Sequence, residues 1–285
     1  MQHGIHFISG LPRSGSTLLA GILRQNPRFH AHISSPVHHL YSTMLAATSR
    51  KHETAPLIDA AQKRALLSGV FDGYYHALHR HKLVFDTNRG WCARMPALAE
   101  LFPDAKLICC VRPIGWIMDS IERIARKNPF ELSSLFGFDA GSTVYSRIQR
   151  VAASEGLVGF ALDALREAYY GEHAERLLLV DYEALAREPA QTLARIYAFL
   201  GEPAFAHDFE NVELSADEFD LPLGAPGLHA VGRRVRFEAR PTVLPPELFA
   251  RFERDAFWLR ESSPYGASVV TLRSLAETSS QRAAV

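Results

Sequence analysis

The chain has 285 residues and an apolar content of 47%, which is enough to fill a large core and excludes a disordered polypeptide. Lys plus Arg and Asp plus Glu number 31 each, so the zero net charge argues against nucleic acid as a partner but allows a local basic pocket. No apolar run approaches the ~20 residues that span a bilayer, and the first residues do not resemble a secretory signal, so we expect a cytoplasmic protein without a membrane span.

The first predicted elements are a strand, a glycine-containing loop and a helix. Residues 5–9 are rich in β-formers, residues 10–17 form the loop, and apolar residues then recur at helical spacing up to Asn26 and Pro27. A mixed, histidine-rich region at 28–58 precedes a helical pattern at 60–81.

Three further apolar runs predict strands, at 83–85, 107–111 and 177–180, and the continuous run at 107–111 is typical of a strand buried on both faces of a parallel sheet. Helices are predicted at 91–101, 114–126, 190–200 and 245–260. The strand at 107–111 contains two of the three cysteines, Cys109 and Cys110, and we expect one on each face. Together with Cys92 they indicate reduced thiols, because an odd number shows no disulfide framework.

Strands that alternate with helices predict an α/β fold, a P-loop-type three-layer sandwich whose central parallel sheet is flanked by helices. We expect residues 1–285 to form a single domain, with a helical insertion at about 128–175 and a long basic loop at about 203–245. Long loops of this kind are usually lids or binding segments. Ligands are expected at the carboxyl ends of the strands.

The loop at 10–17 has the spacing of a phosphate-binding loop, two glycines five residues apart followed by a hydroxyl residue. Backbone N–H groups of such a loop attract an anion, as does the N-terminus of the helix that follows. Position 16 is Ser where ATP-binding loops carry lysine, so ATP chemistry is disfavoured. The predicted side-chain ligands are Arg13, Ser14, Ser16 and Thr17. The alternative is an ordinary tight turn.

A second candidate site pairs Arg112 with Ser120. Arg112 follows a predicted strand, and Ser120 lies roughly two turns into the next helix, so both can reach one phosphate. The alternative places Arg112 in a structural ion pair and Ser120 at the surface.

These two sites resemble the donor-binding residues of the sulfotransferase family. The loop that resembles the family's 5′-phosphosulfate-binding loop consists of Pro12, Arg13, Ser14, Gly15, Ser16 and Thr17. Arg112 and Ser120 resemble the 3′-phosphate-binding pair, and residues 180–185 are similar to the family's Y-E-x-L segment. The matches keep the family's order over residues 4–202, and the loop arginine looks more like the carbohydrate, tyrosyl-protein and bacterial branches.

The resemblance implies transfer of a sulfuryl group from PAPS (3′-phosphoadenosine 5′-phosphosulfate) to a hydroxyl or amine acceptor, in line and without a metal, leaving PAP. Arg13 would stabilise the growing charge, Arg112 and Ser120 would bind the 3′-phosphate, and Tyr182 would lie near the adenine. Small molecules, carbohydrates, lipids and peptide tyrosines all fit as acceptors, and a homodimer is compatible with the sequence.

The general base is left open, because the chain departs here from the family's pattern. Many branches carry a Glu after the first helix, where this chain has a histidine cluster that includes His30 and His38. The cytosolic branch uses a His after the second strand, where this chain has Asp86. Asp86 is the first candidate base, ahead of His38 and His30. Arg89 would contact the donor's sulfate, position the acceptor or pair with Asp86.

The long loop carries His229, Arg233, Arg234 and Arg236. In the family a basic segment late in the chain folds over the 3′-phosphoadenosine, and we take Arg234 as the candidate contact; the alternative is a solvated basic loop. Two other functions stay open. A P-loop kinase or NTPase is favoured by the strand that ends in Asp181, a candidate magnesium-binding acid. A non-catalytic nucleotide-binding protein is favoured by the absence of the family's Glu.

Overall fold

The computed structural model describes residues 4–49, 52–78, 82–214, 217–252 and 254–283. The strands are β1 (Ile5–Gly10), β2 (Phe29–Ala31), β3 (Leu83–Thr87), β4 (Leu107–Val111), β5 (Leu177–Asp181) and β6 (Ser268–Val270). The longer helices are α1 (Ser16–Leu23), α2 (Val37–Ala47), α3 (Ala60–Tyr74), α4 (Met95–Leu101), α5 (Ile114–Lys127), α6 (Val144–Ala152), α7 (Leu157–Tyr170), α8 (Tyr182–Arg187), α9 (Pro189–Leu200) and α12 (Leu272–Ala283). Shorter helical pieces are α10 (Asp217–Asp220), α11 (Pro246–Ala250), and the 3-10 turns η1 (Ala55–Leu57), η2 (Arg89–Arg94), η3 (Ser134–Phe136), η4 (Ala174–Arg176), η5 (Leu221–Leu223) and η6 (Phe257–Leu259).

A central six-stranded sheet has the order β2-β3-β1-β4-β5-β6, and every pairing is parallel. The predicted α/β class with a central parallel sheet is therefore confirmed. Because β1 lies between β3 and β4, the loop after β1 is flanked by the chain segments that leave these two strands. Arg112 leaves β4 on one side, and Arg89 follows β3 on the other.

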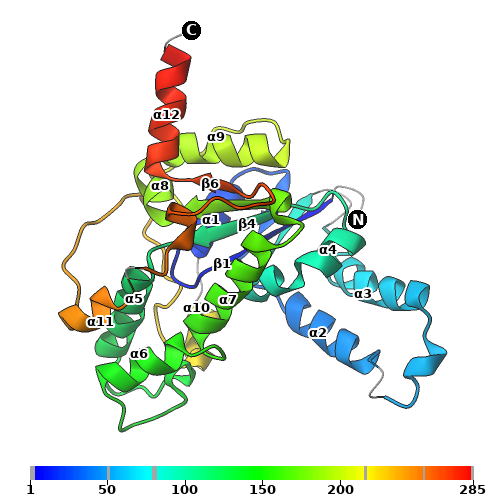
Figure 1. Cartoon of the computed structure of the whole chain (residues 1–285), viewed down its shortest axis with the longest axis horizontal. Helices are drawn as coiled ribbons and strands as arrows, with labels where there is room; N and C mark the ends of the chain where they lie inside the picture. Colours follow the sequence, from blue (N-terminus) through cyan, green and yellow to red (C-terminus); the bar gives the residue numbers. More distant parts are fainter. Residues whose placement is uncertain (1–3, 50–51, 79–81, 215–216, 253, 284–285) are drawn as a thin grey trace.

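Helices cover both faces of the sheet and make three layers (Figure 1). Alternate strand residues such as Phe7 and Leu179 pack with α2 to α7 on one face. Their neighbours, such as Ile8 and Val180, pack with α1, α8 and α9 on the other. Burial on both faces explains why the strands are continuous apolar runs. Cys109 belongs to the first cluster and Cys110 to the second, as predicted.

The structure corrects several predicted boundaries. β2 and α2 lie in the mixed region at 28–58, and β6 and α12 follow the last predicted helix. That helix, predicted at 245–260, is split into α11 and η6. The helix predicted at 60–81 ends at Tyr74, and residues 79–81 lie outside the described part. The strands β2 and β6 have three residues each, which is too short to show a period-two pattern.

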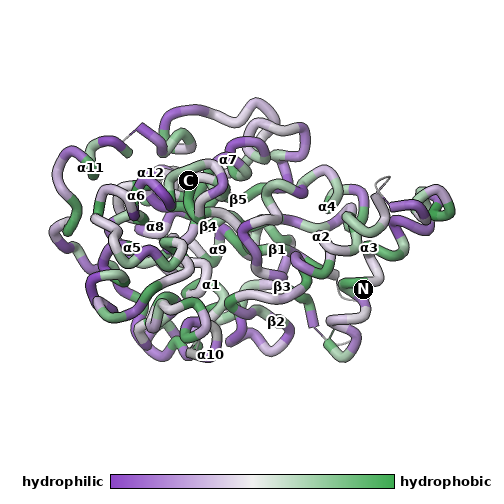
Figure 2. Tube along the Cα trace, turned by 90° about the horizontal axis from the view of Figure 1, so that it is seen from below, coloured by the Kyte–Doolittle hydropathy of each residue, from purple (hydrophilic) through white to green (hydrophobic). Residues whose placement is uncertain are grey.

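Helices α2 and α3 lie at one end of the molecule, and α5 and α11 at the other, in two perpendicular views (Figures 1 and 2). Only Leu67 and Phe71 of α3 are buried. This helix begins at a capping box, in which Asp59 accepts from the Gln62 N–H and the Gln62 side chain accepts from the Asp59 N–H.

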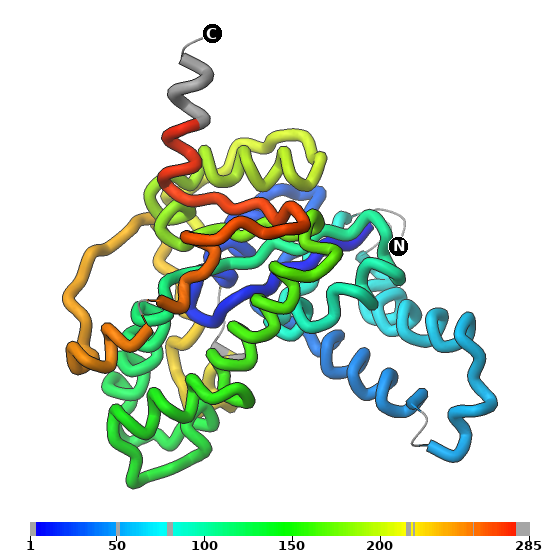
Figure 3. Tube along the Cα trace, viewed as in Figure 1, coloured from blue at the N-terminus to red at the C-terminus, as the bar shows by residue number. Residues whose placement is uncertain are grey.

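The segment at 203–245, predicted as a long basic loop, connects α9 to α11 and is yellow to orange in Figure 3. It is mostly irregular, and hydrogen bonds hold it at several places. The Val212 N–H donates to the Arg233 carbonyl at 2.7 Å, within the segment itself. The Ser133 hydroxyl donates to the Leu223 carbonyl at 3.1 Å, and the Val243 N–H donates to the Asp119 carboxylate at 2.7 Å. The last two bonds tie the segment to the chain before α6 and to α5, beside the carboxyl ends of the strands.

Candidate active site

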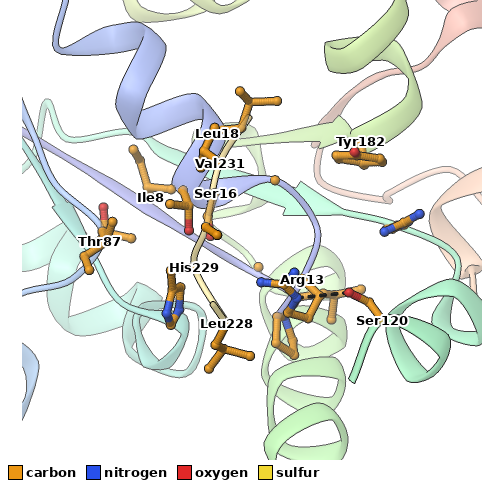
Figure 4. Close-up of a pocket in the computed structure, with 18 of the residues that line it drawn as sticks. Ile8, Arg13, Ser16, Leu18, Thr87, Ser120, Tyr182, Leu228, His229 and Val231 are labelled. Atoms are coloured by element: carbon orange, nitrogen blue, oxygen red, sulfur yellow. Dashed lines mark hydrogen bonds between the residues drawn. The ribbon is translucent and has the colours of Figure 1, made fainter. Parts of the chain in front are cut away.

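A cavity of about 460 Å³ opens at the carboxyl ends of β1, β3 and β4. It is lined by the loop after β1, by the starts of the segments after β3 and β4, and by the late segment at 228–240. This is where a parallel sheet of this order is expected to bind a ligand. Figure 4 shows Ser16 and Arg13 on the loop, with Leu228, His229 and Val231 from the late segment beside them.

The loop after β1 has the backbone of an anion-binding turn. Gly10 has a φ of 98°, and a Cβ there would lie 2.3 Å from the Cys110 carbonyl oxygen, so only glycine fits. Gly15 has a φ of 97° and precedes α1, whose first turn has no side-chain cap. The uncapped N–H groups of α1 therefore face the cavity together with Ser16 and Thr17.

Ser14 differs from its neighbours in the loop. Its side chain is buried, and its hydroxyl donates to the Cys110 carbonyl at 2.7 Å and lies against the Leu11 carbonyl. It does not line the cavity. The Ser14 hydroxyl thus fastens the loop to β4, which is a different task from the anion contact that the sequence suggested.

Arg13 joins the two predicted anion sites. Its Nε donates to the Ser120 hydroxyl at 3.1 Å, an interaction between the loop and α5 (Figure 4). Burial, followed by the nearby Arg112, lowers the pKa of Arg13 to about 10, so the guanidinium stays charged at neutral pH. Two neighbouring cations repel each other, and a bound anion would relieve that repulsion.

Arg112 and Tyr182 form one unit on the β4 side of the cavity. The Arg112 guanidinium lies over the Tyr182 ring, 4.4 Å from its centroid. The same ring packs on the loop, since a Cβ on Gly15 would lie 3.0 Å from Tyr182 Cδ2. Both residues line the cavity, as does Ser120. The predicted pair of Arg112 and Ser120 thus faces the same space as the loop.

Arg240 is a cation of this site that the sequence did not single out. Its Nη2 donates to Asp119 Oδ2 at 3.0 Å, and Arg240 lines the cavity. Asp119 is fully buried on α5 and also accepts from Arg123 at 2.9 Å and from the Val243 N–H at 2.7 Å. Burial alone would raise the pKa of Asp119, but these hydrogen bonds lower it, so the carboxylate is charged and fixes Arg240.

The other late arginines are held at the surface. Arg234 pairs with Glu210 at 2.9 Å and Arg236 with Glu238 at 2.6 Å, and all four side chains are more than half exposed. Arg233 pairs with Glu213 at 3.6 Å and does not line the cavity. Arg234 and Arg236 do line it, although exposed pairs of this kind hold a side chain only weakly.

Asp86, the first candidate base, lies beneath the cavity and does not line it. Its carboxylate is fully buried and accepts from the Ser35 hydroxyl at 2.5 Å, the Tyr75 hydroxyl at 2.6 Å and Trp91 Nε1 at 2.7 Å. Burial raises its pKa, which the three donors oppose only in part. No ion pair joins Asp86 to Arg89 in the described chain. Asp86 therefore holds Ser35, Tyr75 and Trp91 together around β3. Because its carboxylate does not line the cavity, it is not placed to take a proton from an acceptor bound there.

The two candidate histidines near α2 also lie outside the main cavity. His38 stacks edge-on against Trp91, 4.8 Å between ring centroids, and lines a second cavity of about 300 Å³. His30 packs against Tyr75 at 5.9 Å. Burial lowers the pKa of both imidazoles.

The histidine that does line the main cavity is His229. Its Nδ1 lies 2.5 Å from Asp220 Oδ1, and its backbone N–H donates to Asp220 Oδ2 at 2.8 Å. Since a carboxylate only accepts, Nδ1 carries the proton and Nε2 carries the lone pair. Burial lowers the pKa of His229 more than Asp220 raises it, with further lowering from Arg13 and Arg89.

From the sequence, His229 was predicted only as one of the basic residues of the long loop, and Asp220 was not predicted as a site residue. The two are nine positions apart with an irregular turn between them, so no periodicity predicts that they meet. Asp220 is buried. Its place as an acidic residue within an arginine-rich segment is the feature of the sequence that could have indicated a role in the site. Leu228, which packs with Ala225 and Ile124, anchors the chain directly before His229.

No three His, Cys, Asp or Glu side chains gather as a metal site would require in the described ranges. In the same part of the chain, no helix combines the length and the apolar character needed to cross a bilayer.

Comparison with known proteins gave one family match and several structural ones. The model of the sulfotransferase family matches residues 6–207. The sulfotransferase domain from the curacin biosynthetic pathway is 19% identical, with 98% of this chain and 97% of that chain covered and a TM-score of 0.47. The sulfotransferase from Alicyclobacillus acidocaldarius is 17% identical, with 78% and 92% covered and a TM-score of 0.47. Sulfotransferase STF9 from Mycobacterium avium is 14% identical, with 99% and 76% covered and a TM-score of 0.44. A comparison with curated proteins gave no match.

Proposed function

Since the chain belongs to the sulfotransferase family, we propose that it transfers a sulfuryl group from PAPS to a hydroxyl or amine acceptor. The observation that carries the proposal is the single cavity onto which Arg13, Arg112 and Ser120 converge beside an uncapped helix N-terminus. These groups offer charge and hydrogen bonds to two separate anionic groups, which is what a phosphosulfate and a ribose 3′-phosphate require.

The cavity residues divide between the two ends of the donor. The loop N–H groups, Arg13, Ser16 and Thr17 would hold the phosphosulfate, and Arg112, Ser120 and Arg240 would hold the 3′-phosphate. The adenine would lie near Tyr182, whose ring is half-buried. PAPS supplies the sulfuryl group, which leaves its bridging phosphate oxygen as the bond to the acceptor oxygen forms.

His229 is the proposed general base. A hydroxyl that attacks sulfur must lose its proton, and Nε2 of His229 is the lone pair that the Asp220 contact leaves on the cavity side of the pair. The charge that the imidazole then gains is stabilised by Asp220, while Arg13 stabilises the charge that grows on the departing phosphate oxygen. Asp86 and His38 are replaced in this role because neither lines the main cavity.

The kinase and NTPase interpretation gains no support from the site. Asp181, its candidate magnesium ligand, caps α8 by accepting from the Glu183 N–H at 2.9 Å. It does not line the cavity, and Ser16 stands where the clamp lysine would be.

The test of the proposed function is donor binding followed by transfer. PAP should raise the melting temperature in EDTA at micromolar concentration, and ADP, which lacks the 3′-phosphate, should raise it much less. Labelled sulfate should pass from PAPS to an acceptor or slowly to water, and Arg13→Ala should abolish this. If ADP with Mg²⁺ stabilised the protein as well as PAP in EDTA, the proposal would be wrong.

A further inference from the structure

Arg89 is a cation of the cavity that the proposed donor contacts leave unused. It follows β3, on the side of the β1 loop opposite to Arg112 and Ser120, because the strand order is β3-β1-β4. In Figure 4, Thr87 at the end of β3 and Arg13 lie to either side of His229. Arg89 follows Thr87 by two residues, and both Arg89 and Arg13 are close enough to His229 to lower its pKa.

Arg89 has no partner of its own. In the described ranges it forms no hydrogen bond or ion pair, and no carboxylate influences its pKa, which the surrounding protein lowers. Its side chain is nevertheless exposed, since it extends into the open space of the cavity. Arg13, Arg112 and Arg240, by contrast, are each held by a neighbouring side chain.

Leu157 is an apolar side chain that lines both the main cavity and a second one together with Arg89. A second cavity, of about 300 Å³, shares Asn88, Arg89 and Leu157 with the first and continues to Phe160, which is 40% exposed. The two cavities thus meet at Arg89 and give an elongated molecule a path from the surface to His229.

We propose that Arg89 anchors the acceptor, and that the acceptor is an aliphatic hydroxy acid whose carboxylate pairs with Arg89 and whose hydroxyl reaches His229. An unpaired guanidinium favours a carboxylate, which it binds through two parallel hydrogen bonds. The aliphatic chain lies along Leu157 and leaves past Phe160, where it displaces water from apolar surface. Glu155 at the rim of the second cavity disfavours the carboxylate there and orients the molecule with its tail outward.

This inference rests on the proposed function, and its test separates the two. In enzyme saturated with PAP the two phosphate positions of the donor are filled, so an added acid cannot bind there, and the Arg89 variants distinguish the acceptor site from the open sulfuryl position. The probes are 3-hydroxydecanoate and its neutral analogue decane-1,3-diol, with N-acetylglucosamine as a carbohydrate, and the readout is the dissociation constant from calorimetry.

We expect the acid to bind at least about 10-fold more tightly than the diol. Arg89→Met should weaken binding of the acid roughly 10- to 100-fold and leave that of the diol nearly unchanged, so that the preference disappears. Arg89→Lys should restore part of it, because lysine keeps the charge without the two parallel bonds. Arg64→Met, at an exposed pair on α3, is the matched control and should change neither constant.

Three results would overturn the inference while PAP still bound and the proposed function stood. The first is equal binding of acid and diol, or no binding of the acid. The second is tighter binding of N-acetylglucosamine than of the acid. The third is an Arg89→Met enzyme that binds PAPS more weakly but PAP normally, which would assign Arg89 to the sulfuryl group. Failure of PAP itself to bind would instead count against the proposed function.

Discussion

The two sides of the cavity are built differently. On the β4 side every cation has a protein partner: Arg13 bonds to Ser120, Arg112 lies on Tyr182, and Arg240 is fixed by the buried Asp119. On the β3 side Arg89 has none among the described residues, and it shares a second cavity with Leu157 and Phe160.

This difference indicates which side is organised before anything binds. Cations that are already oriented lose little conformational freedom when an anion arrives, so the β4 side suits a ligand that is the same in every turnover. The β3 side gains its order from the molecule that it binds, which suits the variable partner of the reaction. His229 lies between them, influenced by Arg13 from one side and Arg89 from the other.

The largest expected effect comes from the residue where the two sides meet. His229→Gln should lower kcat roughly 10²- to 10⁴-fold, because the variant lacks the imidazole that takes up the acceptor proton. The dissociation constant of PAP should change little, since the donor groups stay in place. Steady-state kinetics of sulfate transfer and PAP calorimetry measure the two quantities.

The control for this variant is His39→Gln, at an exposed position on α2. In the wild type, kcat/KM should fall on acidification with a midpoint below the ordinary histidine value of 6.5, because burial lowers the pKa of His229 and only the neutral imidazole accepts a proton. An equal loss of kcat in His38→Gln, or an acid limb that persists in His229→Gln, would return the base to the other candidates.

The next effect concerns the charge on the departing phosphate. Arg13→Ala should lower kcat roughly 10²- to 10³-fold by removing a preorganised cation, and Arg13→Lys should recover part of the loss. Both variants keep the fold of the loop only if the positive φ of 57° at this position is tolerated, so the melting temperature is measured beside the rate. Full activity in a folded Arg13→Ala protein would break the assignment of the β4 side to the donor.

A smaller effect tests how the β4 side is held. Asp119→Asn should release Arg240 and weaken PAP about 10-fold, with the acceptor KM unchanged. Arg240→Gln should show a similar loss, and Arg234→Gln a clearly smaller one, because Arg234 is held by the exposed Glu210 alone. Larger losses from Arg234→Gln than from Arg240→Gln would show that the late segment closes over the donor in another arrangement.

The β4 side was predicted from sequence in large part because its groups follow strands directly. Arg13 and Arg112 come within three residues of a strand end, and the helix period then places Ser120 near them. The exception is Ser14, whose hydroxyl bonds to the Cys110 carbonyl. That contact depends on the neighbouring strand, which local sequence does not specify.

The groups from the late segment could not be predicted in the same way. Asp220, His229 and Arg240 lie beyond residue 207, where the family match ends, and in a stretch without periodicity. Their positions follow from contacts with α5 and with the chain before α6. Asp86 is the converse case: the sequence places it at a strand end, but three buried donors bind its carboxylate, and these contacts depend on segments that the local sequence does not specify.

The smallest effect is on stability and comes from Asp181, at the end of β5. Burial raises the pKa of this carboxyl to about 6 from 3.8, so between about pH 4 and about pH 6 the folded chain holds a proton that the unfolded chain has lost. Stability from this group is therefore present at low pH and falls as the pH rises through that window. Asparagine cannot ionise and keeps the oxygen that accepts from the Glu183 N–H.

Asp181→Asn should accordingly match the wild type near pH 4 and exceed it by about 1 to 2 kcal/mol above pH 6, measured by urea unfolding at several values of pH. Asp59→Asn, at the exposed N-cap of α3, shows what the same exchange does at a helix start outside the core. The difference also bears on the donor side, because the charged form of Asp181 is stabilised by Arg112. If Asp181→Asn gave no gain in stability at neutral pH, Arg112 would already stabilise the charged Asp181 carboxylate. The Arg112 guanidinium would then be less available to a 3′-phosphate than its stacking on Tyr182 indicates.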